Sequence, residues 1–109
     1  MLISTTSEIE GKNIKEYKGV VFGEVINRVN LFKDFKDFTA NIANIAGGRV
    51  ASYEEGIINT RADAINEMIE RAEKVGANAV IGVKIDYETM GDSMSLLMVV
   101  ASGTAVIIE

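Results

Sequence analysis

The chain contains no cysteine and no histidine, and this limits the chemistry that its side chains can perform. Without cysteine there is no disulfide, thiolate nucleophile or redox pair. Without histidine the chain lacks the commonest general base and the commonest ligand of transition metals. A serine or threonine nucleophile would need another base, and the sequence has neither an S-x-x-K motif nor a Walker loop. The sequence therefore does not favour an enzyme.

Five methionines provide the only sulfur atoms in the chain. Met90, Met94 and Met98 are spaced by four residues in a predicted hairpin, and Met94 and Met98 have the same parity along their strand. Thioether sulfur is a suitable ligand for copper(I), so a methionine-lined site is conceivable. Methionine in such a strand more often fills irregular space in a hydrophobic core. We favour core filling over a copper site.

Carboxylates are the other candidate metal ligands. Glu24, Glu54 and Asp86 could hold a hard cation such as Mg²⁺ or Ca²⁺ if the fold brings several of them together. The sequence contains no EF-hand loop and no other dense acidic string. We expect no organic cofactor, and we keep a metal ion at these three residues as an alternative.

Length and charge limit the class of protein. The 109 residues fit a single domain, residues 1–109. The net charge of −5 argues against binding to nucleic acid or to an anionic membrane, because both need a positive field. No signal peptide is evident, and the uncharged run at 93–108 is shorter than the roughly 18 residues that span a membrane. We expect a soluble, cytoplasmic protein with neither kind of partner.

Hydrophobic periodicity predicts the order of the secondary-structure elements. After a short N-terminal strand, alternation predicts strands over 17–26, 79–87 and 94–108, the last two joined near Gly91. Apolar spacings of four and three predict a helix over 31–45, ended by Gly47-Gly48. They predict a second helix from Ser52 to Gly76, whose apolar stripe is Ile58, Ala62, Ile65, Ile69 and Ala72. The order β-β-α-α-β-β indicates an α+β fold, with a mixed or antiparallel sheet and helices on one face.

The last predicted strand is apolar on both of its faces. One parity contains Met94, Leu96, Met98, Val100 and Val106, and the other contains Leu97, Val99, Ala101, Ala105 and Ile107. Such a strand needs cover on both sides, whereas two helices in a chain of this length cover one face of a small sheet. Another copy of the chain would supply the missing cover. The sequence therefore predicts a homo-oligomer whose interface includes residues 94–107.

Six segments of the chain occur in the order and spacing of a known family, and they cover nearly its whole length. They are Gly19–Val25, Gly47–Arg49, Tyr53-Glu54, Arg61, Gly76–Val83 and Ala101–Val106. Together they resemble the YbjQ-like family, also called the UPF0145 family, which is labelled as heavy-metal-binding. The resemblance implies a small α+β subunit of the dodecin-like kind that assembles into a pentameric ring. The metal label conflicts with the residues, because heavy metals are held mainly by cysteine and histidine.

The resemblance also singles out a set of polar and glycine residues as a candidate site. They are Glu24, Gly47, Gly48, Arg49, Tyr53, Glu54 and Arg61. Arginine donors and an approachable glycine backbone could bind a small molecule or an anion. The alternative, which we favour, is a structural ion network. Glu24 shares a strand face with Phe22 and Ile26, so we expect it to be largely buried and paired with Arg49 or Arg61.

Three functional hypotheses remain at this point. The first, which we favour, is a non-enzymatic subunit of a homo-oligomeric ring that binds or stores a small ligand and has other copies of itself as its partner. The second is a metal-binding module, as the family label implies. The third is an enzyme of unknown reaction.

Overall fold

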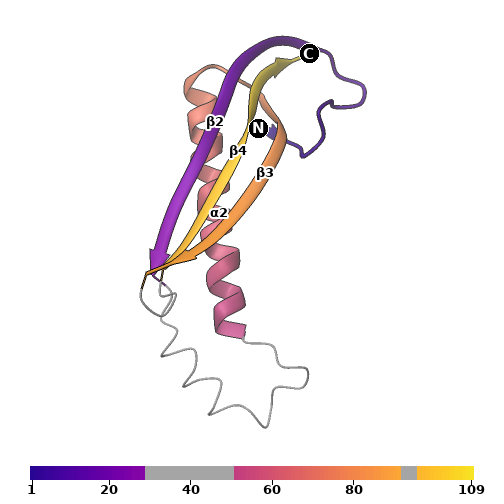
Figure 1. Ribbon diagram of the computed structural model, residues 1–109. Helices are drawn as coiled ribbons and strands as arrows, with labels where there is room; N and C mark the ends of the chain where they lie inside the picture. The colour runs from indigo at the N-terminus through magenta and orange to yellow at the C-terminus, as the bar shows by residue number, and fades with distance from the viewer. Residues whose placement is uncertain (29–50, 92–95) are drawn as a thin grey trace.

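The computed structural model describes residues 1–28, 51–91 and 96–109 (Figure 1). The predicted helix over 31–45 and the Gly47-Gly48 pair lie outside the described residues. The described elements are β1 (Leu2–Ile3), β2 (Ile14–Arg28), α2 (Ala51–Lys74), β3 (Ala79–Met90) and β4 (Leu96–Ile108). The predicted strands are confirmed, and α2 confirms the second predicted helix, although it includes Ala51 and ends at Lys74.

The four strands form one mixed sheet in the order β1-β3-β4-β2. The central strand β4 is antiparallel to both β2 and β3, which confirms a mixed sheet. The short strand β1 lies parallel to β3 and pairs only Leu2 with Ala79 and Ile3 with Val80. Since β2 and β3 both run opposite to β4, they run in the same direction as each other.

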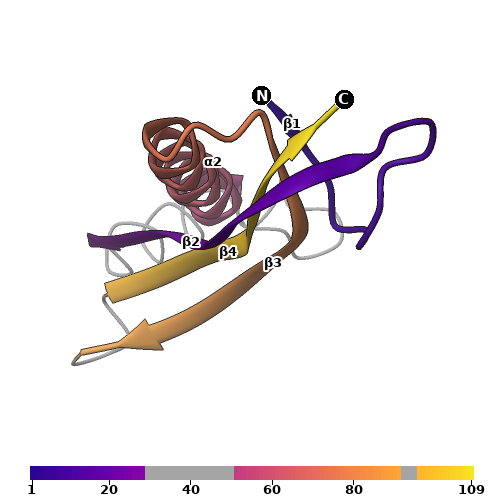
Figure 2. The same ribbon diagram turned by 90° about the horizontal axis from the view of Figure 1, so that it is seen from above.

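The helix α2 covers one face of the sheet (Figures 1 and 2). Ala64, Met68 and Ala72 have no exposed surface, and they pack against a strand face that includes Val21, Val80, Leu97, Val99, Ala101 and Ala105. The predicted apolar stripe of the helix is therefore only partly right: Ala72 is buried and Ile65 packs against this core, but the centre of the buried face lies elsewhere. Ile58, which belonged to that stripe, is 51% exposed. The helix is rotated relative to our prediction, with Thr60, Ala64, Met68 and Ala72 turned to the sheet.

Gly23 of β2 explains this rotation. A Cβ atom at this position would lie 1.8 Å from the backbone oxygen of Ala64 and 2.6 Å from the backbone nitrogen of Met68. The backbone of the helix therefore rests directly on the backbone of the strand. Such close approach requires glycine in the strand and favours small residues such as Ala64 in the helix.

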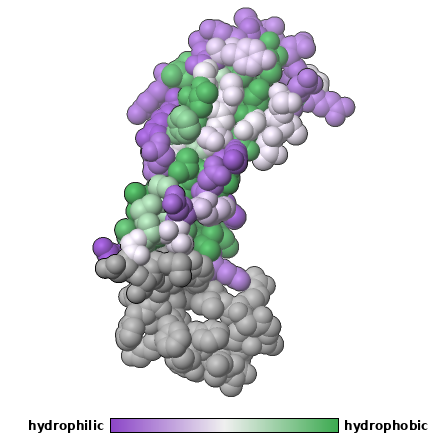
Figure 3. Space-filling model, in the orientation of Figure 1, coloured by the Kyte–Doolittle hydropathy of each residue, from purple (hydrophilic) through white to green (hydrophobic). Residues whose placement is uncertain are grey.

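The other face of the sheet is covered only at one end by described residues. There, Ile9 and Ile14 pack against Ala79, Ile81 and Val106. Farther along β2, Val20, Phe22 and Ile26 are 65%, 44% and 59% exposed. Figure 3 is seen from this side, and hydrophobic residues lie among charged ones over the strands. We call this surface the open face and define it by Val20, Phe22, Glu24, Ile26, Lys84, Asp86, Glu88, Met98 and Val100.

Candidate functional site

Glu24 lies on the open face and is exposed, so our prediction that it is buried was wrong. Its side chain is 58% exposed, and its Oε1 atom lies 3.6 Å from Nη1 of Arg71. The expectation of burial assumed that an apolar strand face is covered, but in the described residues α2 covers the opposite face. The ion pair is with Arg71 of α2, neither with Arg61 nor, as far as the described residues extend, with Arg49.

Arg71 reaches from α2 around the outer side of β2. Its Nη1 atom donates a hydrogen bond to the backbone oxygen of Phe22 at 2.7 Å, and its Nη2 atom pairs with Glu67 one helical turn earlier. The Glu67 pair depends on helical spacing alone, because the two residues are four apart in α2. Sequence reasoning missed the contact with β2, because that contact depends on where the helix lies against the sheet.

Arg61 contacts a tyrosine of β3. Its Nη1 atom lies 3.5 Å from the hydroxyl oxygen of Tyr87, to which it donates a long hydrogen bond. Close by, Ile57, Tyr87, Glu88, Thr89 and Leu97 line a mostly apolar hollow of about 380 Å³ between α2 and the adjacent ends of β3 and β4. Tyr87 was counted in the sequence only as a strand residue. The sequence contains no pattern that shows which tyrosine of a strand will contact a helix.

The remaining family positions are only partly described. Gly47, Gly48 and Arg49 lie outside the described residues, and so does the side chain of Tyr53 in the first turn of α2. Glu54 is partly buried in the same turn. Glu54 and Arg61 are seven residues apart, about two turns of the helix, so they lie along one side of it. Whether the whole set converges stays a prediction.

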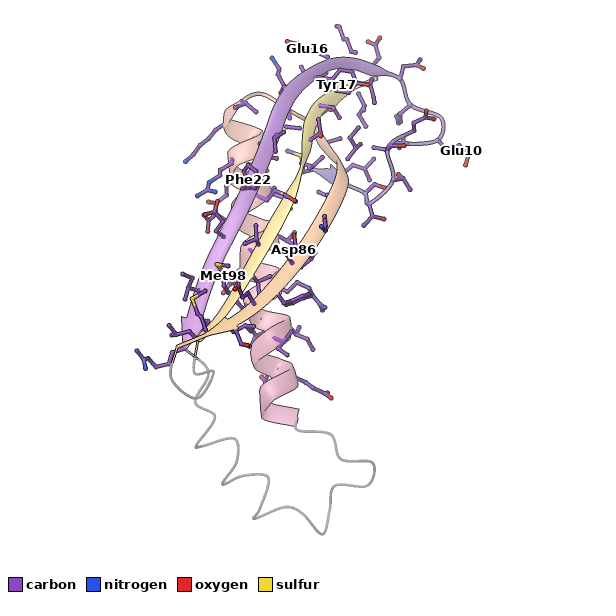
Figure 4. All side chains as sticks on the ribbon, in the orientation of Figure 1. Glu10, Glu16, Tyr17, Phe22, Asp86 and Met98 are labelled. Atoms are coloured by element: carbon purple, nitrogen blue, oxygen red, sulfur yellow. The ribbon has the colours of Figure 1, made fainter. Side chains whose placement is uncertain are left out.

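The described carboxylates do not form a metal site. Glu24 and Asp86 lie on the open face on either side of Val100, with β4 between their strands (Figure 4). Two strand spacings, about 10 Å, separate their backbones. Each has a cation nearby, because Arg71 lies 3.6 Å from Glu24 and Lys84 lies 3.5 Å from Asp86. Among the described residues, no three carboxylates gather in a way that could hold a metal ion.

Two of the three methionines considered as copper ligands lie among the described residues. Met90 pairs with Leu96 and Met98 pairs with Glu88, which makes the two methionines diagonal neighbours on one face. Met94 lies outside the described residues. The donor set seen here therefore does not fit the nitrogen and thiolate ligands that heavy metals prefer.

A second hollow, of about 510 Å³, lies at the opposite end of the molecule. Its lining comes from the N-terminal segment and the start of β2, and it is mainly polar: Ser7, Glu8, Ile9, Lys12, Asn13, Ile14 and Tyr17. Figure 4 shows Tyr17 on β2 at this end of the sheet. None of its residues belongs to the family positions named above.

In the described part of the chain, no helix has the length and apolar character needed to cross a membrane.

The comparison with solved structures gives the fold. A crystal structure from Pediococcus pentosaceus, of a protein with unknown function that belongs to the DUF74 family, matches with a TM-score of 0.62 and 19% identity. The match covers 100% of this chain and 98% of that one.

Comparison of sequences gives closer relatives. A UPF0145 protein of Clostridium botulinum (strain Alaska E43 / Type E3) is 57% identical over 109 residues and is matched along its entire length. A UPF0145 protein of Listeria monocytogenes (serovar 1/2a) is 55% identical over 109 residues, which cover 100% of this chain and 96% of the relative. A family model described as "Putative heavy-metal-binding" matches residues 1–109. The chain therefore belongs to the UPF0145, or YbjQ-like, family.

Proposed function

We propose that this chain is a non-enzymatic subunit that works as a homo-oligomeric ring of five copies. Two sequence features support the non-enzymatic part: the chain has no histidine and no cysteine. The number five comes from the family resemblance. We further propose a cytoplasmic location, since a chain without cysteine needs no oxidising compartment to fold.

The open face is the observation that carries the assembly. Val20, Phe22 and Ile26 project from one side of β2 and are each more than two-fifths exposed. They neighbour Met98 and Val100, which are half-buried. Covering the exposed parts of Val20, Phe22 and Ile26 would contribute on the order of 1 kcal/mol each. A second copy of the chain is the cover that we propose for this surface.

We also propose that the ring binds a small ligand. The hollow beside Arg61 supports this, because its volume of about 380 Å³ lies in the range of ligand pockets, and because Tyr87 and Thr89 place polar groups at an otherwise mainly apolar lining. Arg61 adds a planar set of donors next to Tyr87. The ligand class that fits is a small, partly apolar molecule with an acceptor group for the arginine.

The metal-binding alternative is supported by the description of the family model. The ligands in this chain do not favour it, for the reasons given above. Calorimetric titration of the purified protein with Zn²⁺, Cd²⁺ and copper(I) decides between the two. Saturable binding of one ion per chain at micromolar concentration would replace our proposal with a metal-binding function.

Light scattering coupled to size-exclusion chromatography tests the assembly. The expected result is a single species with about five times the chain mass of 11.8 kDa. A well-folded species at the mass of one chain, at micromolar concentration, would overturn the proposed function.

A further inference from the structure

The sheet ends in β2 on one side. On the other side the two-residue strand β1 covers only the start of β3, so the rest of β3 forms that edge. Each edge presents backbone N–H and C=O groups on the side that faces away from β4. Such edges are templates for pairing with another chain, and proteins usually block them. Among the described residues the blocking is partial, and it stops at a definite residue on each strand.

On β3, the N-terminal segment occupies the outer side as far as Val83. β1 pairs with Ala79 and Val80, the N–H of Gly82 donates to the oxygen of Thr6 at 2.8 Å, and the N–H of Val83 donates to the oxygen of Ser4 at 3.0 Å. From Lys84 to Met90, no described residue pairs with the outer side of the strand.

On β2, Arg71 occupies the outer side at Phe22, whose carbonyl oxygen accepts its hydrogen bond at 2.7 Å. In an edge strand, every second residue directs its N–H and C=O groups away from the sheet. Because the carbonyl oxygen of Phe22 accepts from Arg71, the outward-directed backbone groups of β2 are those of Phe22 and of every second residue after it. Beyond it, from Glu24 to Arg28, no described residue pairs with the edge.

These two edge segments, which no described residue covers, have matching directions and matching faces. β2 and β3 are parallel within one copy, so the β3 edge of one copy and the β2 edge of another pair in parallel when their helices lie on the same side. Glu24 and Arg28 point to the open face, and so do Lys84 and Glu88 by their pairing with Ser102 and Met98. Registers of this pairing that keep the four side chains on the same face of the joined sheets differ in steps of two residues.

Charge selects one of these registers. Within one copy, Glu24 of β2 and Asp86 of β3 both lie opposite Val100 of β4. If β2 of one copy and β3 of its neighbour keep this alignment, Glu24 lies beside Asp86. A shift of two residues in one direction places Glu24 beside Glu88 instead. Both arrangements oppose like charges, which destabilises a sheet. The shift the other way places Glu24 beside Lys84 and Arg28 beside Glu88, with Ile26 beside Asp86. It also begins the new pairing at Glu24, just past the contact of Arg71, and at Lys84, just past the N-terminal segment.

We propose that the edge of β3 over Lys84–Met90 pairs in parallel with the edge of β2 over Glu24–Arg28 of a neighbouring copy, with Lys84 beside Glu24 and Glu88 beside Arg28. This inference rests on the proposed self-assembly and adds to it a contact between strand edges, beside the proposed cover of the open face. Arg28 and Glu88 have no ion-pair partner among the described residues of their own chain, so the contact supplies one for each. The contact joins two different edges, and repeating it closes a ring.

Pairing of β2 with β2 of another copy is the competing arrangement. An antiparallel β2 pair centred on Ile26 also brings Glu24 beside Arg28. It joins only two copies, however, and leaves the β3 edge unpaired in both. It therefore gives a dimer, in which Ile26 of one copy lies beside Ile26 of the other.

Cross-linking of engineered cysteines separates these arrangements, and the cysteine-free chain has no background reaction. The test variant carries Arg28→Cys and Glu88→Cys together, and it is treated with a short bis-maleimide. The controls are each single variant, the single variant Ile26→Cys, and Arg28→Cys combined with Lys84→Cys. That last pair is four residues out of register, about 13 Å along the strand.

The expected result is a ladder of linked chains, from dimer to complete ring, for the Arg28→Cys and Glu88→Cys pair. The out-of-register pair should react at least tenfold more slowly, and the single variants should form no ladder. Rapid dimer formation by Ile26→Cys alone would overturn the inference in favour of the β2 pair.

Light scattering on the same samples separates the two proposals. If the protein is an oligomer but the two double variants react at the same rate, the edge contact is wrong and the assembly stands. If the untreated protein is a monomer, the proposed function fails, and this inference fails with it. As a second measurement, Arg28→Glu should raise the concentration at which the ring half-dissociates by about tenfold, and adding Glu88→Arg should restore it.

Discussion

The two faces of this sheet differ in how closely their side chains are packed. The face under α2 contains small residues such as Gly23, Ala101 and Ala105, and the helix approaches it until backbone meets backbone. The open face contains larger side chains, among them Phe22 and Ile26, which remain exposed. The comparison shows that a small residue such as Gly23 lets the helix approach one face closely, whereas alternation of apolar residues shows only that a strand has two faces.

The largest expected effect is at Gly23. Gly23→Ala should lower the free energy of unfolding by about 4 kcal/mol or more, because the new Cβ meets helix backbone that cannot rotate away. That loss is comparable to the total stability of many small domains. Thermal and urea denaturation followed by circular dichroism measure it.

Gly56→Ala is the matched control, since Gly56 lies in α2 and a Cβ there meets no atom within 4 Å. It should stabilise the protein by about 0.5–1 kcal/mol, the usual gain from alanine in a helix. Equal melting temperatures for Gly23→Ala and the unmodified protein would show that helix and strand are not in backbone contact.

The next effect compares neighbours on β4 that face opposite ways. Leu97 is 3% exposed under α2, so Leu97→Glu should cost about 3 kcal/mol or more by burying a charge. Met98→Glu places the same charge on the open face. It should leave the fold intact and prevent assembly, which circular dichroism and light scattering report separately. Loss of folding in both variants would mean that both faces are covered within one copy.

The smallest effect is at the ion pair between Glu24 and Arg71. Both side chains are substantially exposed, and exposed pairs contribute little. Glu24→Gln should change the free energy of unfolding by about 0.5 kcal/mol or less, as measured by urea denaturation. Arg71→Gln is the companion variant, and it should cost slightly more because it also removes the hydrogen bond to Phe22. A loss of several kcal/mol from Glu24→Gln would instead support the buried pair that the sequence had suggested.

Much of the fold was predictable from the sequence, because strand and helix periods are local properties. The strands predicted over 17–26, 79–87 and 94–108 and the helix predicted from Ser52 to Gly76 correspond to elements that the structure has over 14–28, 79–90, 96–108 and 51–74. The rotation of α2 was not predictable from periodicity, since Ile58 and Met68 are both apolar and only contact with Gly23 selects between their faces. For the same reason the exposure of Glu24 and its contact with Arg71 could not be predicted.

The candidate site was less predictable than the fold. Arg61 was identified through family resemblance, and its neighbour Tyr87 is brought close by the packing of α2 against β3. A constellation formed by residues far apart in the chain leaves no spacing that can be read from the sequence. By contrast, the absence of histidine and cysteine was certain from composition, and it argues against a heavy-metal site of nitrogen and thiolate ligands and against a thiolate nucleophile.

The pairing of β2 with β4 has a consequence for how the chain folds during synthesis. In the described sheet β2 forms its ladder with β4, from Ile14 opposite Ile108 to Arg28 opposite Leu96. The ribosome therefore releases an early, apolar strand long before the strand that pairs with it. Contacts this distant in sequence form slowly, and an unpaired strand is prone to aggregate while it waits. We expect newly made chains to fold only after β4 has left the ribosome and to benefit from chaperones until then.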